Sequence, residues 1–404
     1  MRGRILFLCA VIGVAAGFLV RWTFVAKRPP EVRAAVGGIK WAASIDKLAA
    51  YYISPVLGPD GTLYAASGDG RILAVDPSSE VRWQFRVETN DYVSIDGGLV
   101  QDEQKNLYFT TLDSVYSLLP SGLKRWAVSC PPARTVYGHR GATFDTNAVY
   151  TTCGEHFTAL DKSDGRIIWS QPALDASSAP VLLASGDLAF VRERRITTGH
   201  PDGIAISFFP FAPASAVASP PGTNSASDPY IDTPVAVGPD GTLYAGSGVH
   251  KFVALNPDNT IKWTFDAGVS GFRSSPVIAS DGTIIVLTTQ SVVLALAPDG
   301  TLKWTFPVTQ APYGTGQTAP LIGSDGTIYV VAGRRLVALS PEGKLNWDLG
   351  VGITTASPAL APDGTLYVAT MDGVIYAVQT ASRGLMQSSW PKYQRDSSNS
   401  GRSR

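Results

Sequence analysis

The chain has 404 residues, of which 45% are hydrophobic and only 16% are charged. Its 33 basic and 33 acidic side chains cancel, so the protein has no net field that would attract nucleic acid or acidic lipid. Three cysteines exclude a disulfide-dense scaffold and a cysteine-rich zinc or iron–sulfur site.

The first segment has the pattern of a targeting signal. Arg2 and Arg4 precede an uncharged apolar run, residues 5–20, which as a helix would be about 24 Å long. Continued to residue 26, with Arg21 reaching the interface, the helix would be about 33 Å long and could span a bilayer. No small-residue cleavage site follows, which favours a retained anchor over a cleaved signal peptide.

We therefore expect residues 1–27 to be a signal anchor that crosses a bacterial inner membrane once, followed by a linker over residues 28–37. Export would place the rest of the chain in the periplasm or another extracytoplasmic space. Positive side chains flank the apolar run on both sides, so the sequence specifies the orientation of the anchor only weakly.

Seven tryptophans recur along the rest of the chain with a period of roughly 43 residues, which is typical of propellers and paired-helix repeats. The interval after the fourth is twice as long, as if one tryptophan were missing. The periodic residues are Trp41, Trp83, Trp126, Trp169, Trp263, Trp304 and Trp347. Their regular return predicts a structural role in packing between repeats.

Between the tryptophans, each repeat holds four short apolar or alternating runs separated by turn residues. Asp-Gly pairs such as Asp60-Gly61 and Asp240-Gly241 are typical of hairpin turns, because they tolerate a positive φ. No helical period occurs in the repeats. Four antiparallel strands in each repeat predict an all-β chain folded as a β-propeller.

Eight blades are expected over residues 38–380, followed by a tail over residues 381–404. Most repeats open with a proline, such as Pro55 or Pro276, which suits an edge strand facing the central channel. The eighth repeat, from Ser357, has three strands and no tryptophan-bearing fourth. We expect the strand around Trp41 to complete that blade and close the ring. In the fourth blade, residues 212–229 are rich in Pro, Ser and Ala and indicate an extended surface loop.

The segment ALDKSDGRIIW, from Ala159 to Trp169, resembles the tryptophan motif of pyrroloquinoline-quinone (PQQ) repeat propellers, and shorter versions start at Ala254, Ala295 and Ala338. The resemblance covers nearly all of the predicted propeller and implies a PQQ-like propeller of the BamB-like and quinoprotein-like superfamily. Residues 390–396 also resemble a Trp-Pro-x-aromatic segment that is common near such propellers.

Two branches of this superfamily imply different functions. Quinoprotein dehydrogenases hold PQQ and calcium in the channel, beside a stacking tryptophan, a vicinal disulfide and a catalytic aspartate. This sequence has no Cys-Cys pair, its repeats leave no tryptophan for the inside of the ring, and nothing matches that catalytic motif. BamB-like proteins imply a non-enzymatic envelope scaffold, although they are usually lipoproteins and no lipobox surrounds Cys9.

We therefore expect a monomeric, membrane-anchored propeller of the bacterial cell envelope that acts as a protein-binding or scaffold module rather than an enzyme. Its expected partner is an envelope protein or an anionic ligand, and no cofactor is predicted. Two alternatives stay open: an oxidoreductase that uses PQQ and calcium, and a module that binds polysaccharide or the cell wall.

In a four-stranded blade the turns between strands two and three, and the connections between blades, lie on one face, which we call the loop face. The Asp-Gly turns lie on the opposite face, the turn face. Cationic and aromatic residues on the loop face predict a site for an anionic group or acidic peptide, unless they are merely solvated loop tips. The candidates are Asp91, Tyr92, Tyr137, His139, Arg140, His156, Arg273, Tyr313, Arg334 and Arg335, with Arg134, His250 and Lys251 nearby.

Cys130 and Cys153 are also expected on the loop face, where an exported protein could join them by a disulfide. The four histidines lack ligand spacing, and single Asp-Gly turns lack the spaced ligand set of a calcium site, so no metal site is predicted. No nucleophile elbow or phosphate loop occurs, and no catalytic residue is proposed.

Overall fold

The computed structural model describes residues 34–44, 54–67, 70–87, 95, 98–111, 113–131, 141–172, 178–192, 195–202, 206–208, 233–248, 250–258, 260–268, 270–308 and 318–403. All regular elements in these ranges are strands. None of the described residues belongs to a helix of the length and apolarity needed to cross a bilayer. The predicted anchor over residues 1–27 and the predicted loop over residues 212–229 lie outside the described residues.

The strands form eight four-stranded antiparallel sheets, as predicted, and we number these blades in chain order. Blade 1 comprises β2 (Val56–Leu57), β3 (Leu63–Ala66), β4 (Arg71–Val75) and β5 (Val81–Arg86). Blade 2 comprises β6 (Val100–Gln101), β7 (Leu107–Thr110), β8 (Ser114–Leu118) and β9 (Lys124–Ser129). Blade 3 comprises β10 (Ala142–Phe144), β11 (Ala148–Cys153), β12 (His156–Asp161) and β13 (Ile167–Pro172). Blade 4 comprises β14 (Val181–Leu182), β15 (Leu188–Arg192), β16 (Arg195–Gly199) and β17 (Ile206–Phe208).

The second half of the chain repeats this order. Blade 5 comprises β18 (Ala236–Val237), β19 (Leu243–Gly246), β20 (Lys251–Leu255) and β21 (Ile261–Asp266). Blade 6 comprises β22 (Val277–Ile278), β23 (Ile284–Leu287), β24 (Val292–Leu296) and β25 (Leu302–Pro307). Blade 7 comprises β26 (Leu321–Ile322), β27 (Ile328–Ala332), β28 (Arg335–Leu339) and β29 (Leu345–Gly350). Blade 8 combines β30 (Ala359–Leu360), β31 (Thr365–Ala369) and β32 (Val374–Gln379) with β1 (Ile39–Ser44).

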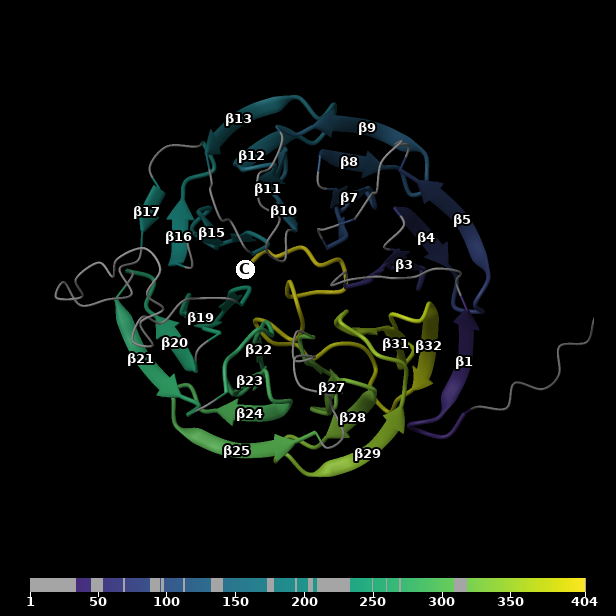
Figure 1. The fold of residues 1–404 in the computed structure, drawn as a ribbon, viewed down its shortest axis with the longest axis vertical. Helices are drawn as coiled ribbons and strands as arrows, with labels where there is room; N and C mark the ends of the chain where they lie inside the picture. The colour runs from purple at the N-terminus through teal and green to yellow at the C-terminus, as the bar shows by residue number, and fades with distance from the viewer. Residues whose placement is uncertain are drawn as a thin grey trace, which may run out of the picture. The chain divides into compact units, whose positions relative to one another are not determined.

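Within residues 34–403 the blades follow one another around a ring, with the first strand of each blade innermost (Figure 1). In blade 8 the outer strand is β1, which pairs antiparallel with β32 and places Trp41 opposite Ala377. The all-β, eight-bladed architecture predicted from the repeat is confirmed.

The prolines that open two of the inner strands follow a hydroxyl residue that accepts a backbone N–H group from the second strand of the same blade. Ser178 Oγ, two residues before Pro180, accepts the backbone N–H of Val191 at 2.8 Å. Thr233 Oγ1, directly before Pro234, accepts that of Gly246 at 2.8 Å. The inner strand can therefore begin with proline without leaving a buried N–H unpaired.

The hydrophobic core is divided into clusters, each lying between neighbouring blades. One joins Leu57 and Leu73 of blade 1 to Ala359 and Tyr367 of blade 8, and Trp41 packs against it. Similar clusters join the other neighbouring blades around the ring. Each blade thus buries one face against the preceding blade and the other face against the following blade. This explains why the middle strands are apolar on both faces.

Each periodic tryptophan of the outer strands also contacts the following blade. The indole N–H of Trp83 donates to the carbonyl of Pro120 at 2.9 Å, and its ring lies against Gly122 in the same turn. Trp304 makes the equivalent contacts with Pro341 and Gly343. Further indole hydrogen bonds of this kind link Trp41 to Pro77, Trp126 to Lys162, Trp169 to Pro201 and Trp263 to Pro298.

The same contact crosses the point where the ring is joined. Trp347 of blade 7 packs on Gly37, two residues before β1, and Trp41 of β1 bonds to blade 1. The structural role predicted for these tryptophans follows from this geometry, because each indole ties the outer edge of one blade to the turn of the next.

Gly122 tests this interblade contact. It has a φ of 84°, and a Cβ there would lie 2.6 Å from the Trp83 ring. Gly186 has a similar φ of 89° with open space around it. We expect Gly186→Ala to cost about 1 kcal/mol of unfolding free energy from backbone strain alone, and Gly122→Ala to cost about 1–3 kcal/mol more because the ring must move. Urea denaturation of both variants measures this, and equal losses would show that the indole contact is dispensable.

Candidate functional site

After β32 the chain crosses the turn face of blade 7 and enters the central channel, where residues 388–403 lie (Figure 1, yellow). We call residues 388–403 the channel segment. The preceding residues are fixed to blade 7, since Ser382 Oγ donates to Asp325 at 2.5 Å and the backbone N–H of Ser324 donates to Gly384 at 2.9 Å. The sequence predicted these residues only as part of a tail.

The channel segment hydrogen-bonds to the inner strands that surround it. Its carbonyls accept backbone N–H groups from five blades, at distances between 2.7 and 3.0 Å. The donor–acceptor pairs are Leu57 to Ser397, Gln101 to Ser398, Leu182 to Gly401, Ile278 to Trp390 and Ile322 to Pro391. In blade 3 the hydroxyl of Thr143 donates to the carbonyl of Ser400 at 2.7 Å. The inner edges of six blades therefore find a backbone partner in one segment of the same chain.

Two aromatic side chains of the segment fill the space between blades. Trp390 is fully buried and packs with the cluster shared by blades 4, 5 and 6. Tyr393 is 7% exposed, and its hydroxyl lies close to where a Cβ would project from Gly98 and Gly141. The sequence analysis left no tryptophan for the inside of the ring, and this was wrong, because Trp390 lies outside the repeats. At Gly141 a Cβ would lie 2.6 Å from the Ala179 Cβ, so the neighbouring blade leaves no room for a side chain there.

Lys392 lies at the centre of the segment and is 1% exposed. Its ammonium group donates to the carbonyls of Tyr393 and Asp396, both at 3.1 Å, and to the side-chain carbonyl of Asn399. The Asn399 amide in turn donates to the carbonyls of Ser54 at 3.2 Å and Leu99 at 3.0 Å, which belong to blades 1 and 2. One buried cation thus holds the segment in a compact loop and orients the amide that attaches it to two blades.

Burial lowers the pKa of Lys392 to about 8, although the neighbouring Asp396 carboxylate acts in the opposite direction. Around neutral pH the side chain is still charged. Its charge is compensated by three oxygens of the segment itself.

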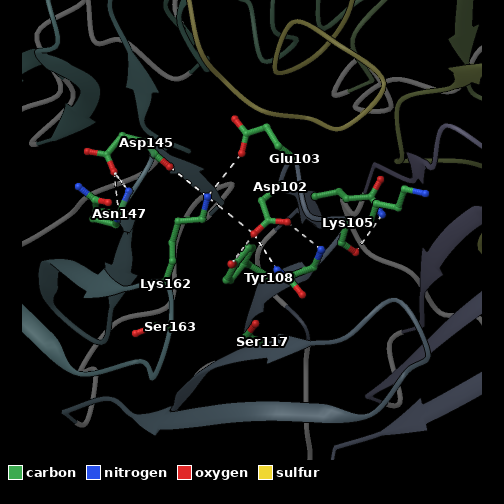
Figure 2. Close-up of polar contacts among 12 residues, drawn as sticks. Asp102, Glu103, Lys105, Tyr108, Ser117, Asp145, Asn147, Lys162 and Ser163 are labelled. Atoms are coloured by element: carbon green, nitrogen blue, oxygen red, sulfur yellow. Dashed lines mark hydrogen bonds and ion pairs between the residues drawn. The ribbon is translucent and has the colours of Figure 1, made fainter.

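Where the segment leaves the channel on the turn face, it meets a buried polar cluster between blades 2 and 3 (Figure 2). The Asp102 side chain is fully buried and accepts hydrogen bonds from the Tyr108 hydroxyl at 2.7 Å and from the backbone and side chain of Asn106 at 2.8 and 3.0 Å. Burial and the Asp102 carboxylate raise the pKa of Tyr108, so the phenol stays protonated and donates.

Lys162 connects this cluster to blade 3. Its ammonium group donates to the carbonyl of Asp145 at 3.1 Å and lies 3.7 Å from Asp102 and 3.5 Å from Glu103 (Figure 2). Glu103 also pairs with Arg402 of the channel segment. Lys162 and Arg402 both lie over the Phe144 ring, at 4.7 and 5.4 Å from its centre.

Beside this cluster a cavity of about 330 Å³ opens between the segment and blades 2 and 3. Its lining is charged and hydroxyl-rich, with Asp102, Glu103, Phe144, Asp396, Ser400 and Arg402 among the residues that form it. Its carboxylates are already satisfied by protein donors, which indicates that the cluster mainly fixes the end of the segment.

The loop face is described only in part. Asp91, Tyr92, Tyr137, His139, Arg140 and Tyr313 lie outside the described residues, so the structure does not place them. Among the described candidates, Arg273 lies in the connection before β22 and Arg334 in the turn between β27 and β28, and both are exposed. Arg335 pairs with Asp348 on the adjacent strand, and Lys251 pairs with Asp266. Two of the cationic side chains are thus held by carboxylates of their own blades.

The disulfide considered from sequence is present: Cys130, just after β9, is bonded to Cys153 at the end of β11, with a Cα–Cα distance of 5.0 Å. It ties the connection between blades 2 and 3 to the turn of blade 3 on the loop face. His156 begins the next strand beside it, and its buried Nδ1 has no hydrogen-bond partner among the described residues.

The Asp-Gly turns do not gather into a cation site. Asp60 accepts hydrogen bonds from Thr62 and Arg82, and Asp240 accepts one from Lys262 at 2.8 Å. For Asp240, burial opposes ionisation, but the Lys262 and Thr242 hydrogen bonds outweigh it and lower the pKa to about 2. Within the described ranges no group of three or more metal-ligating side chains is found.

Comparison with known proteins finds one matching family model and several similar solved structures. The family model described as outer membrane protein assembly factor BamB matches residues 215–392, which extend from before blade 5 to Lys392 in the channel segment. Together with the eight four-stranded blades, this match agrees with the tryptophan motif. The matched residues are similar to that family, and the part of the chain that the structure describes is a β-propeller. Among curated proteins, none matches the chain in sequence.

Solved structures similar to this propeller show the same fold at low identity. BamB from Moraxella catarrhalis is 16% identical, with a TM-score of 0.63, over 84% of this chain and 98% of that one. The C-terminal WD40 domain of Sif2 is 10% identical, with a TM-score of 0.66, over 86% and 100% of the two chains. Streptogramin B lyase is 16% identical, with a TM-score of 0.50, over 72% and 94%.

We call the end of the channel that the channel segment fills the channel mouth. The described residues at the channel mouth do not fit a PQQ–calcium site. The inner-strand N–H groups of five blades are engaged by the channel segment, and the Trp390 ring is fully buried in the core rather than open for stacking. The only described disulfide joins residues 23 apart instead of neighbours.

Removing the disulfide tests how firmly the loop face is held. Closing a loop with a sequence separation of 23 stabilises a fold by roughly 3 kcal/mol. We expect Cys130→Ala/Cys153→Ala to lose about that much unfolding free energy in urea, whereas Cys9→Ala should lose none. Thiol titration of the unfolded wild-type chain should rise on reduction, and a titre unchanged by reductant would contradict the pairing.

Lys392 gives a prediction with a defined pH dependence. Lys392→Met leaves three oxygens without their donor and should cost about 2 kcal/mol at pH 7. Between the folded pKa of about 8 and the ordinary value of 10.5, the unfolded wild-type chain binds more protons than the folded one, so its stability rises with pH.

The stability difference between the wild type and Lys392→Met should therefore widen by on the order of 1–2 kcal/mol from pH 7 to pH 9.5. The matched control Lys344→Met replaces an exposed lysine, and its unfolding free energy should equal that of the wild type at both pH values. Urea denaturation at each pH measures the difference, and a difference that stays constant or narrows would contradict the burial of a charged ammonium group.

Proposed function

We propose that this PQQ-like propeller is a protein-binding scaffold of the bacterial cell envelope, anchored to the inner membrane by residues 1–27 with its blades outside the cytoplasm. The observation that carries the proposal is the occupation of the channel mouth by the protein's own channel segment. With that mouth filled, the outer surfaces are the parts of the propeller left for a partner.

Two further observations support this proposal. The matching family model is named for outer membrane protein assembly, which is the work of an envelope scaffold. A disulfide between Cys130 and Cys153 suits an oxidising, extracytoplasmic compartment.

We place the partner on the loop face, where Arg273 and Arg334 project exposed guanidinium groups from the connection before blade 6 and the turn of blade 7. Guanidinium groups bind carboxylates in a bidentate manner, so an acidic segment of an envelope protein is the partner that suits them. Arg335 and Lys251 contribute less, because they are paired within their own blades.

Site-specific crosslinking in the native envelope tests this assignment. A photoreactive side chain at Arg273 or Arg334 should capture a discrete protein partner, and the charge reversal Arg273→Glu/Arg334→Glu should reduce capture about tenfold or more at a neighbouring loop-face position. The matched control Lys344→Glu reverses an exposed charge at the turn between β28 and β29, on the turn face, and should leave capture unchanged. Equal capture by all three proteins would remove the loop face as the docking surface. Binding of PQQ with calcium to the full chain, followed by dye-linked turnover, would instead favour the oxidoreductase.

A further inference from the structure

The channel segment has the properties of a peptide ligand bound to a site, although it belongs to the same chain. It is connected to blade 8 through residues 380–387, of which Gln387 is exposed. All of its described contacts with the inner strands are noncovalent.

Part of the recognition depends only on the peptide backbone. The inner strands of blades 1, 2, 4, 6 and 7 each donate one N–H group to a carbonyl of the segment. At blade 4 the bonding is reciprocal, since Leu182 donates to Gly401 and Ser403 donates to Leu182, both at 2.7 Å. Main-chain bonds of this kind provide affinity when a sheet edge binds a peptide.

Side chains supply the specificity. Trp390 enters the core between blades 4 and 6 and is fully buried. Asn399 reaches the carbonyls of Ser54 and Leu99, and Lys392 orients it by donating to its side-chain carbonyl. A segment without these three side chains would leave an apolar cavity and two buried carbonyls without partners.

We propose that the channel mouth is a peptide-binding site whose ligands are peptides with a tryptophan two residues before a lysine and an asparagine seven residues after that lysine, which fold into a compact loop in the site. The chain fills this site in cis, and a peptide of the same pattern competes for it in trans. The site is separate from the loop face, so the proposal does not depend on the partner suggested there. A short covalent connection gives the cis segment an effective concentration of about millimolar order, which a competitor must overcome.

The test begins from the full folded chain. A protease recognition sequence is inserted between Gln387 and Ser388, where the chain is exposed, and the purified protein is cleaved after folding. Size-exclusion chromatography with mass spectrometry then measures whether the fragment from residue 388 onwards stays with the propeller. A fluorescein-labelled synthetic peptide of residues 388–404 is added to measure exchange by anisotropy.

We expect the fragment to remain bound after cleavage and the labelled peptide to replace it slowly. A peptide with Asn399→Ala should bind about tenfold or more weakly, because two hydrogen bonds to buried carbonyls are lost. The matched control Ser397→Ala should bind within about threefold of the wild type, since its carbonyl rather than its hydroxyl bonds to Leu57.

Loss of the fragment from a propeller that remains folded would overturn the proposal, as would equal binding of the Asn399→Ala and wild-type peptides. If cleavage instead leads to unfolding, an excess of the free peptide should prevent it. Unfolding at the same rate with and without the peptide would also overturn the proposal.

Discussion

The structure depends on how the inner edges of its blades are satisfied. A β-propeller closes its ring without open edges between blades, but the first strand of each blade still presents unpaired backbone groups to the channel. Here proline removes some of these groups, and hydroxyls such as those of Ser178 and Thr233 replace ladder partners. The channel segment accepts N–H groups from the inner strands of five blades. The segment therefore fastens the blades together at their inner ends, while the tryptophans of the outer strands fasten them at the rim.

This arrangement is the basis of the proposal that a partner binds the outer surfaces of the propeller. A channel mouth that is filled by backbone, a buried tryptophan and a compensated lysine is a structural centre rather than an open pocket. The loop face, which contains the Cys130–Cys153 disulfide and the exposed Arg273 and Arg334, is the surface that we propose for the partner. The same filled mouth is a recognition site in its own right if its occupant can be exchanged.

Most of the fold could be predicted from the sequence because every blade repeats the same sequence pattern. The 43-residue recurrence of tryptophan, the Asp-Gly turns and the alternation of apolar residues each reflect a local geometry that returns in every blade. The position of residues 388–403 could not be predicted in this way, since a single non-repeating segment has no period to reveal it. Its one signal was indirect, a Trp-Pro sequence outside the repeats. For the loop face, the sequence pointed to more binding residues than the structure leaves available. The sequence lists the cationic residues but does not show that Arg335 is paired with Asp348.

Amide hydrogen exchange of the full-length protein tests most directly whether the channel segment holds the inner strands. The N–H groups of Leu57, Leu182 and Ile278 bond to the segment, so they should exchange as slowly as the amides in the middle strands of the same blades. Trp390→Ser should speed up exchange at these inner positions more than in the outer strands. Rapid exchange at Leu57, Leu182 and Ile278 in the wild-type protein, at the rate of exposed loops, would contradict the account.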